Sequence, residues 1–215
     1  MDVQTSHDVL ATAPLDNRAR YQLLTTLVVP RPIAWISTYS ADGTRNLAPF
    51  SYFGALAATP MLVGVSIGDR RRGLKDTLNN IRETGAFCIN IVTARQLAAM
   101  NATAGEYLAN VDEFTVAELP SRDADHVPAP FVADCPAVLE CRLFKEVELE
   151  GAPNTLVIGE VVAVRLDPEL AMEPGTKFLQ PQALETVGRL GSQDYVLSGD
   201  VVRMARPLVT ELSGG

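Results

Sequence analysis

Basic residues gather at positions 70–75 of a chain that is otherwise acidic, with three arginines at 70–72 and a lysine at position 75. Asp76 and Thr77 follow directly, at the start of a segment whose apolar residues recur with helical spacing. A helix N-terminus offers free N–H groups and a partial positive charge to an anion, and Lys75 and the Thr77 hydroxyl would add a charge and a donor. This pattern predicts a phosphate site. The alternative is a solvated basic turn in which Asp76 only caps the helix.

A second group of residues lies on two strand-like segments, 35–38 and 46–53, that face each other across the turn signal Asp42-Gly43. Small residues and Pro49 allow the backbone to approach a flat ligand closely. Hydroxyl and backbone amide groups could then bond the edge of a heteroaromatic ring. The alternative interpretation is an aromatic-rich hairpin that forms ordinary core.

The residues that are missing narrow the chemistry further. The chain has two histidines, His7 and His126, which argues against a histidine-dependent triad or a multi-histidine metal centre. It contains no G-x-S-x-G, H-E-x-x-H, Walker or G-x-G-x-x-G motif. A Rossmann-type dinucleotide domain is therefore not expected.

Composition indicates one globular domain in the cytoplasm. The chain has 215 residues, of which 47% are hydrophobic and 20% charged, and its net charge of −8 argues against a broad nucleic-acid surface. It shows no secretory signal and no apolar run of about 18 residues, so we expect no membrane partner. Three cysteines without zinc-like spacing suggest reduced thiols. Cys135 and Cys141 could be bridged if the fold brings them together, but buried apolar roles are favoured.

The elements that would position these residues are mostly strands joined by hairpins. We expect a lead-in segment at 1–20, a domain at 21–205 and a tail at 206–215, with a long irregular excursion at 104–134. The hydrophobic patterns predict helices at 75–82 and 93–101 and strands at 33–39, 44–53, 61–67, 86–92, 138–150, 155–167 and 187–196. The fold class is mainly β with short helices (α+β), built as an antiparallel barrel.

Taken in order, these segments resemble the flavin reductase-like family of FMN-binding split-barrel proteins, which includes flavoredoxins. The resemblance covers roughly residues 20–200 and rests on PRPIAWIST at 30–38, NLAPFSYF at 46–53, KDTL at 75–78, TG at 84–85, IGEV at 158–161, and GRLG at 188–191 with Tyr195. Gly191-Ser192 departs from the Gly-Gly pair of many relatives, which puts the shape of that loop in doubt.

The resemblance implies a Greek-key split barrel that forms a homodimer and holds FMN non-covalently near the subunit interface. It implies no catalytic side chain and no metal, because the cofactor carries the reactive atom. By resemblance and by the arguments above, the cofactor-binding residues are Trp35, Ser37, Thr38, Ala48, Pro49, Phe50, Ser51, Arg72, Lys75, Asp76, Thr77 and Arg189.

The activity implied is that of an FMN-dependent oxidoreductase in which NAD(P)H reduces the bound flavin. Free flavin, oxygen or a redox partner protein would then accept the electrons. One alternative is a flavoredoxin-like carrier or FMN-binding protein without intrinsic NAD(P)H oxidation. Another is an enzyme that acts on an organic substrate, with Tyr107, Phe114 and Phe131 in the pocket wall, although isolated aromatics more often serve packing. The last alternative is a split barrel whose pocket no longer binds a ligand.

Overall fold

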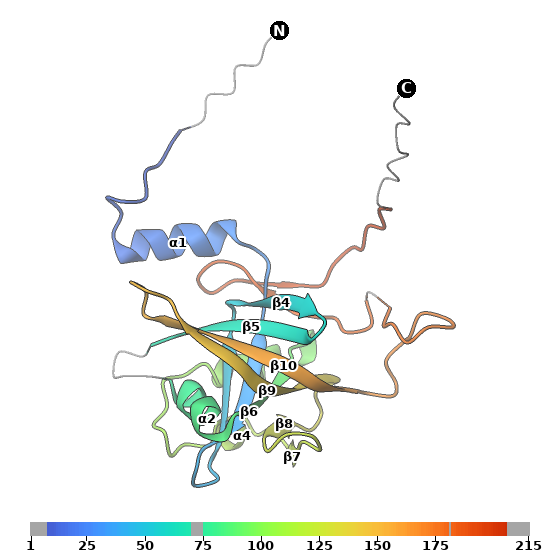
Figure 1. Cartoon of the computed structure of the whole chain (residues 1–215). Coiled ribbons are helices and arrows are strands. Elements are labelled where there is room, and N and C mark those ends of the chain that lie inside the picture. The colour runs from blue at the N-terminus through green and yellow to red at the C-terminus, as the bar shows by residue number, and fades with distance from the viewer. Residues whose placement is uncertain (1–7, 70–74, 181, 206–215) are drawn as a thin grey trace, which may run out of the picture.

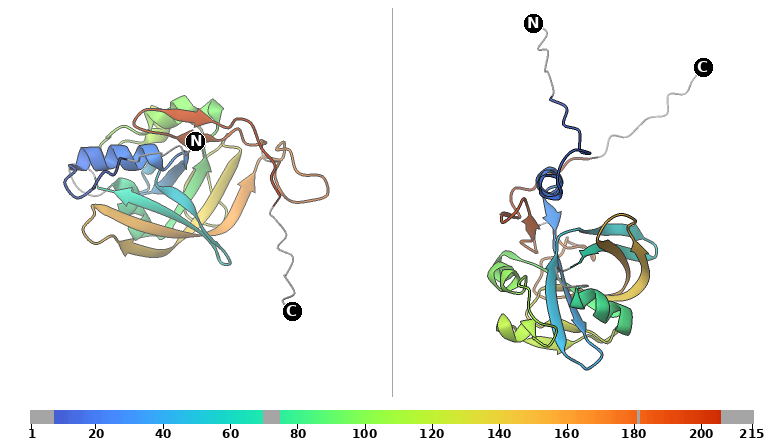
Figure 2. Two further views of the ribbon diagram at one scale, coloured as in Figure 1. Left: turned by 90° about the horizontal axis from the view of Figure 1, so that it is seen from above. Right: turned by 90° about the vertical axis from the view of Figure 1, so that its left-hand side faces the viewer.

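Seven antiparallel strands curl into a barrel that forms the body of the protein (Figures 1 and 2). The computed structural model describes residues 8–69, 75–180 and 182–205. The strand order is β3-β2-β6-β9-β10-β5-β4, so β9 and β10 lie between β6 and β5, and the consecutive strands β3 and β4 form the two edges of the sheet. The strands are β2 (Ala34–Tyr39), β3 (Arg45–Phe50), β4 (Phe53–Ala58), β5 (Met61–Gly68), β6 (Ala86–Ile91), β9 (Ala137–Glu148) and β10 (Asn154–Leu166).

The strands of this sheet bury both faces, which creates two apolar cores. Successive side chains of a strand point to opposite faces, so Ile36 packs inside the barrel while Trp35 packs outside it. The outer core lies between the barrel wall and the segment that follows β6, and it includes Phe114 and Phe131. Helix α2 (Asp76–Thr84) contributes Leu78 to the inner core.

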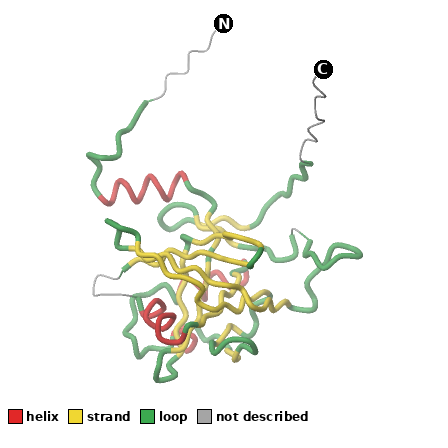
Figure 3. Tube along the Cα trace, in the orientation of Figure 1, coloured by secondary structure: helices red, strands yellow, loops and turns green. Residues whose placement is uncertain are grey.

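The remaining elements lie around this barrel, as the helices in Figure 3 show. Residues 104–134 are not irregular throughout, because they contain a helical turn and a two-stranded sheet that pack on the outer core. The elements around the barrel are α1 (Asn17–Leu27), β1 (Arg31–Pro32), η1 (Ala94–Gln96), α3 (Leu97–Ala102), α4 (Glu113–Val116), β7 (Ser121–Asp123), β8 (Pro130–Val132), β11 (Val187–Arg189) and β12 (Tyr195–Leu197).

Helix α1 lies outside the barrel and buries only Thr25 (Figure 1). Arg31 fastens it: the guanidinium donates to the carbonyls of Thr25 at 2.5 Å and Val28 at 2.9 Å, at the negative end of the helix. The same guanidinium donates to the carbonyl of Leu190 at 2.6 Å, beside β11. One buried side chain therefore joins the start of the chain to its C-terminal hairpin.

The fold class expected from the sequence is confirmed, and three details of the elements differ. The expected lead-in at 1–20 contains the start of α1, which crosses position 20. The expected strand at 44–53 is two strands, broken at Ser51 and Tyr52. The helix expected at 93–101 begins as a 3₁₀ turn with Thr93 as its cap. The favoured interpretation of the cysteines is confirmed: all three are free and buried, and burial raises the pKa of Cys135 to about 11.

Within the described residues, no helix combines the length and the apolar character needed to cross a membrane. The expected tail at 206–215 lies outside the described residues.

Candidate functional site

A pocket of about 190 Å³ lies where strand β3 ends. Pro49, Phe50 and Ser51 line it together with Arg189 of β11 and Tyr21 of α1. Four residues predicted from two distant parts of the sequence thus meet in one place. The other lining residues are Ile33, Met100, Ala104 and Tyr195.

Arg189 is held in a defined orientation beside this pocket. Its guanidinium lies 4.4 Å from the centroid of the Tyr195 ring and donates to the Tyr195 hydroxyl and to the Ser192 carbonyl. The Tyr195 hydroxyl in turn donates to Asn101 Oδ1 at 3.2 Å. Stacking and hydrogen bonding together restrict the arginine, so that its charge faces the pocket with little freedom to move away.

Strand β3 is an edge strand of the barrel sheet and pairs only with β2. The N–H of Leu47 faces away from β2, because it donates to the Glu113 carboxylate at 3.1 Å. In an antiparallel pair this direction alternates, so Pro49 faces the same way and has no N–H to leave unpaired. On the side that faces away from β2, the half-buried segment 48–51 therefore has no unpaired backbone N–H at position 49.

A buried polar network couples β3 to helices α4 and α2. Glu113 is 3% exposed and accepts from Asn46 Nδ2 at 3.0 Å, and Asn46 Oδ1 accepts from the Thr77 hydroxyl at 2.7 Å. Burial raises the pKa of the Glu113 carboxyl, and the hydrogen bonds from Leu47 and Asn46 oppose this only in part. This network therefore fixes the position of the start of α2 relative to the edge strand β3.

The N-terminus of α2 keeps the features that the phosphate prediction requires. Lys75 is the half-buried N-cap in extended conformation and makes no side-chain cap bond, and Asp76 begins the helix. The Lys75 carbonyl already accepts from Leu78 and Asn79. The N–H groups of the first turn and the lysine charge suit an anion there. Arg72 lies outside the described residues.

Several residues that were predicted to contact the cofactor have side chains buried in the core. Trp35, Ser37 and Thr38 are fully buried, and β2 has a partner strand on both sides. Trp35 Nε1 donates to Thr103, Ser37 donates to the Pro130 carbonyl, and Thr38 accepts from Asn80 Nδ2. The Thr77 hydroxyl is likewise engaged with Asn46. These side chains bond to residues that hold β3 and α2 in place, and nothing in their positions indicates direct contact with a ligand. Ala48, Pro49, Phe50, Ser51, Lys75, Asp76 and Arg189 remain as predicted contacts.

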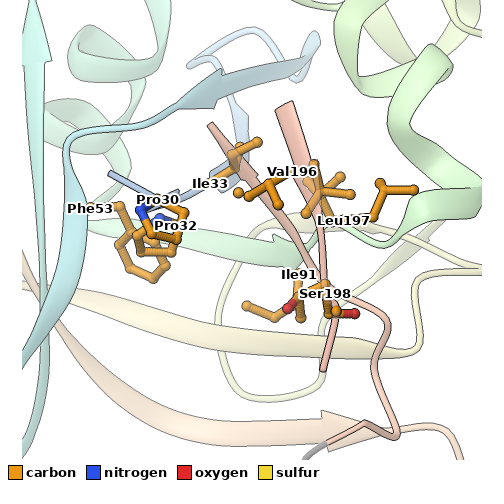
Figure 4. Close-up of a pocket in the computed structure, with 13 residues that line it drawn as sticks. Pro30, Pro32, Ile33, Phe53, Ile91, Val196, Leu197 and Ser198 are labelled. Atoms are coloured by element: carbon orange, nitrogen blue, oxygen red, sulfur yellow. The ribbon is translucent and has the colours of Figure 1, made fainter. Parts of the chain in front are cut away.

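A second, apolar cavity of about 370 Å³ is lined by the sheet of β1, β11 and β12 together with Phe53 of β4 and Ile91 of β6 (Figure 4). Figure 4 shows Pro30, Pro32 and Phe53 on one side and Val196 and Leu197 on the other. It is made by strand ends and not by the 104–134 excursion. Phe114 and Phe131, expected as alternatives for a pocket wall, are buried in the outer core, so the packing interpretation holds for both.

Sequence reasoning missed Tyr21, Met100 and Glu113. Tyr21 lies on a helix that was not expected, and Met100 reaches the pocket from α3. Glu113 stood among scattered acids in the excursion, where nothing distinguished it from a solvated carboxylate. Only its burial and its contacts with β3 reveal its role.

Comparison with known proteins identifies the family. The model of the family described as "Flavin reductase like domain" matches residues 26–179. The chain belongs to this family. The resemblance of the sequence to flavin reductase-like split-barrel proteins is thereby confirmed.

Solved structures agree with this assignment. The chain is 30% identical to nitrilotriacetate monooxygenase component B from Bacillus cereus, with a TM-score of 0.86 over 93% of this chain and 100% of that one. It is 27% identical to the 2-nitrobenzoate 2-nitroreductase NbaA of Pseudomonas fluorescens, with a TM-score of 0.85 over 96% and 100% of the two chains. An uncharacterized protein of Deinococcus radiodurans is 34% identical over 94% of this chain and 90% of its own length.

Proposed function

We propose that this protein is an FMN-dependent oxidoreductase that uses NAD(P)H as its electron donor. The observation that carries the proposal is the pocket in which Pro49, Phe50 and Ser51 meet Arg189, in a chain of the flavin reductase-like family. FMN would supply the ring that accepts a hydride, which no side chain of the protein can do. A cytoplasmic location is part of the proposal and agrees with three free cysteines.

The described residues fit FMN at both of its ends. The α2 N-terminus and Lys75 suit the phosphate, and the outer edge of 48–51 suits the rim of a flat ring. The Glu113–Asn46–Thr77 network holds these two places at a fixed separation. Arg189 brings a positive charge to the ring end of the pocket.

We also propose that the working unit is a homodimer. The pocket in one chain, at about 190 Å³, is smaller than the roughly 300–1,000 Å³ typical of ligand sites, so a second subunit would complete its wall. Helix α1 beside it exposes Tyr21, Leu24 and Leu27, its C-cap Val28 is exposed as well, and Leu27 is 77% exposed. Contiguous apolar residues of this kind are typical of a protein interface.

The first experiment is an absorbance spectrum of the purified protein, followed by denaturation and identification of the released chromophore. Released FMN would support the proposal, and a colourless protein that takes up no added FMN would refute it. Consumption of NADH or NADPH by the FMN-loaded protein then separates a reductase from a flavoredoxin-like carrier or FMN-binding protein, which would bind FMN but oxidise neither nucleotide.

Lys75→Ala tests the phosphate assignment, with Lys145→Ala as a matched control on the exposed face of β9. Loss of a charge-assisted hydrogen bond, about 1.5–3 kcal/mol, would weaken FMN binding about tenfold or more. The control should bind FMN as the wild type does. Equal FMN affinity in both variants would remove the phosphate from this helix.

An organic substrate is a second candidate, and the apolar cavity of Figure 4 favours it. The structural similarity to a 2-nitrobenzoate 2-nitroreductase makes nitroaromatic compounds the class to test. Reduction of a nitroaromatic compound faster than of free flavin, under equal donor concentration, would select this candidate.

A further inference from the structure

A cleft of about 700 Å³ opens between the η1–α3 helical segment and the loop that joins β11 to β12. Both views of Figure 2 show this C-terminal hairpin, in red, lying against the green helical segment. The cleft shares Arg189 and Tyr195 with the smaller pocket at the end of β3. A ligand could therefore extend from one into the other.

Two arginines line this cleft, with Arg95 at the side that it shares with a neighbouring pocket beside Asp134, and neither has a carboxylate partner closer than 3.5 Å among the described residues. The Arg95 side chain is 78% exposed, and its only ion pair among the described residues joins Nη2 to Asp134 Oδ2 at 3.5 Å. An exposed pair of that length contributes little. Arg189 contacts the Tyr195 ring and a carbonyl, and in the described part of the chain no carboxylate pairs with it. On a protein of net charge −8, two such groups in one cleft favour an anionic ligand.

The rest of the lining suits a polar ligand of some size. Asn101 and Gln193 add amide groups, and Ala98 on the helix face leaves room beside them. The volume lies within the range of small-molecule sites, about 300–1,000 Å³. Arginine forms bidentate hydrogen bonds with phosphate, and two arginines in one cleft can share the double charge of a phosphate ester.

We infer that this cleft binds the phosphate groups of a second nucleotide, with its reactive ring directed toward the pocket at the end of β3. The inference rests on the proposed function, because a nucleotide that reacts there must place its ring against the bound flavin. Two substrates carry this chemistry: the nicotinamide dinucleotide donor, which has a pyrophosphate, and a free flavin mononucleotide acceptor, which has a single phosphate.

Arg95→Ala in the FMN-loaded protein is the test, and Arg122→Ala, an exposed arginine on β7, is the matched control. Titration calorimetry with adenosine diphosphate, and with adenosine, measures the cleft without any turnover. We expect the diphosphate to bind the wild type, to bind Arg95→Ala about tenfold more weakly, and to bind the control as the wild type. FMN affinity should stay the same in all three proteins.

Steady-state kinetics then distinguish the two sources of phosphate. A KM for the dinucleotide that rises about tenfold in Arg95→Ala, with KM for free FMN unchanged, assigns the cleft to the donor. The converse assigns it to the acceptor. No binding of adenosine diphosphate, with both KM values unchanged in Arg95→Ala, overturns the inference. If the wild type binds no FMN, the proposed function fails, and calorimetry on the protein as purified still decides whether the cleft binds phosphate.

Discussion

Replacement of Glu113 by alanine tests how the edge strand β3 is held in the barrel. The Glu113 carboxylate is buried and accepts hydrogen bonds from Asn46 Nδ2, at 3.0 and 3.1 Å, and from Leu47 N at 3.1 Å. Alanine at this position removes the acceptor and leaves both donors in a place that water does not reach.

The size of the effect follows from these contacts. A buried donor left without an acceptor costs about 1–3 kcal/mol, so two donors bound the loss at about 2–6 kcal/mol. Part of this is offset, because burial raises the pKa of Glu113 and its ionised form is therefore costly to bury. We expect the free energy of unfolding to fall by about 2–4 kcal/mol.

Urea unfolding followed by the fluorescence of Trp35, the single tryptophan, measures this loss from within the outer core. Glu106→Ala, which removes an exposed acid from the same excursion, is the control and should change the free energy by less than about 0.5 kcal/mol. FMN affinity should fall in Glu113→Ala only. A loss below about 1 kcal/mol in Glu113→Ala would show that the carboxylate does not hold the strand.

Three further changes address the barrel, the N-terminal helix and the pH dependence. Gly159→Ala would press a Cβ against Phe87 Cζ inside the barrel, so unfolding in urea should show a loss of about 1–3 kcal/mol. In the control Gly54→Ala, the new Cβ meets nothing within 4 Å, so that loss should be absent. In Arg31→Lys, the lysine ammonium cannot donate to all three carbonyls at once, so the helix at 17–27 should be held less firmly. Limited proteolysis should then cut this helix about tenfold faster while the barrel stays intact. An unchanged rate of cutting would contradict the role of Arg31. Glu113 has a raised pKa in the folded state, so its protonated form contributes stability that is present below the unfolded value of about 4.5 and is lost as pH rises through the raised folded value. In Glu113→Gln, unfolding free energies measured from pH 4 to 8 should lack this decline, and parallel curves for both proteins would disprove the assignment.

Much of the barrel could be predicted from local patterns in the sequence. The apolar run at 61–67 and the stop at Thr84-Gly85 depend on neighbours in the chain, and the structure has strand β5 and the end of α2 there. Gly85 shows why, because it adopts a φ of +68° and its N–H bonds to the Ile81 carbonyl, as expected of a glycine that ends a helix.

The direction in which each side chain points was harder to predict. Trp35 and Ser37 were assigned to a ligand because their types suit one, but strand alternation places them in the outer core, whose other half comes from residues beyond position 100. Tyr21 and Glu113 join the site through contacts with segments far away in the chain. No local pattern carries that information.

The bonds of Arg31 separate the building of the barrel from the building of the pocket. The chain leaves the ribosome from its N-terminus, and the third acceptor of Arg31, the Leu190 carbonyl, follows 159 residues later. The last barrel strand, β10, ends at Leu166, so every barrel strand precedes Arg189 in the chain. The seven barrel strands therefore pair among themselves without the C-terminal hairpin, whereas the pocket also needs Tyr21 and Arg189, which come from elements outside the barrel sheet.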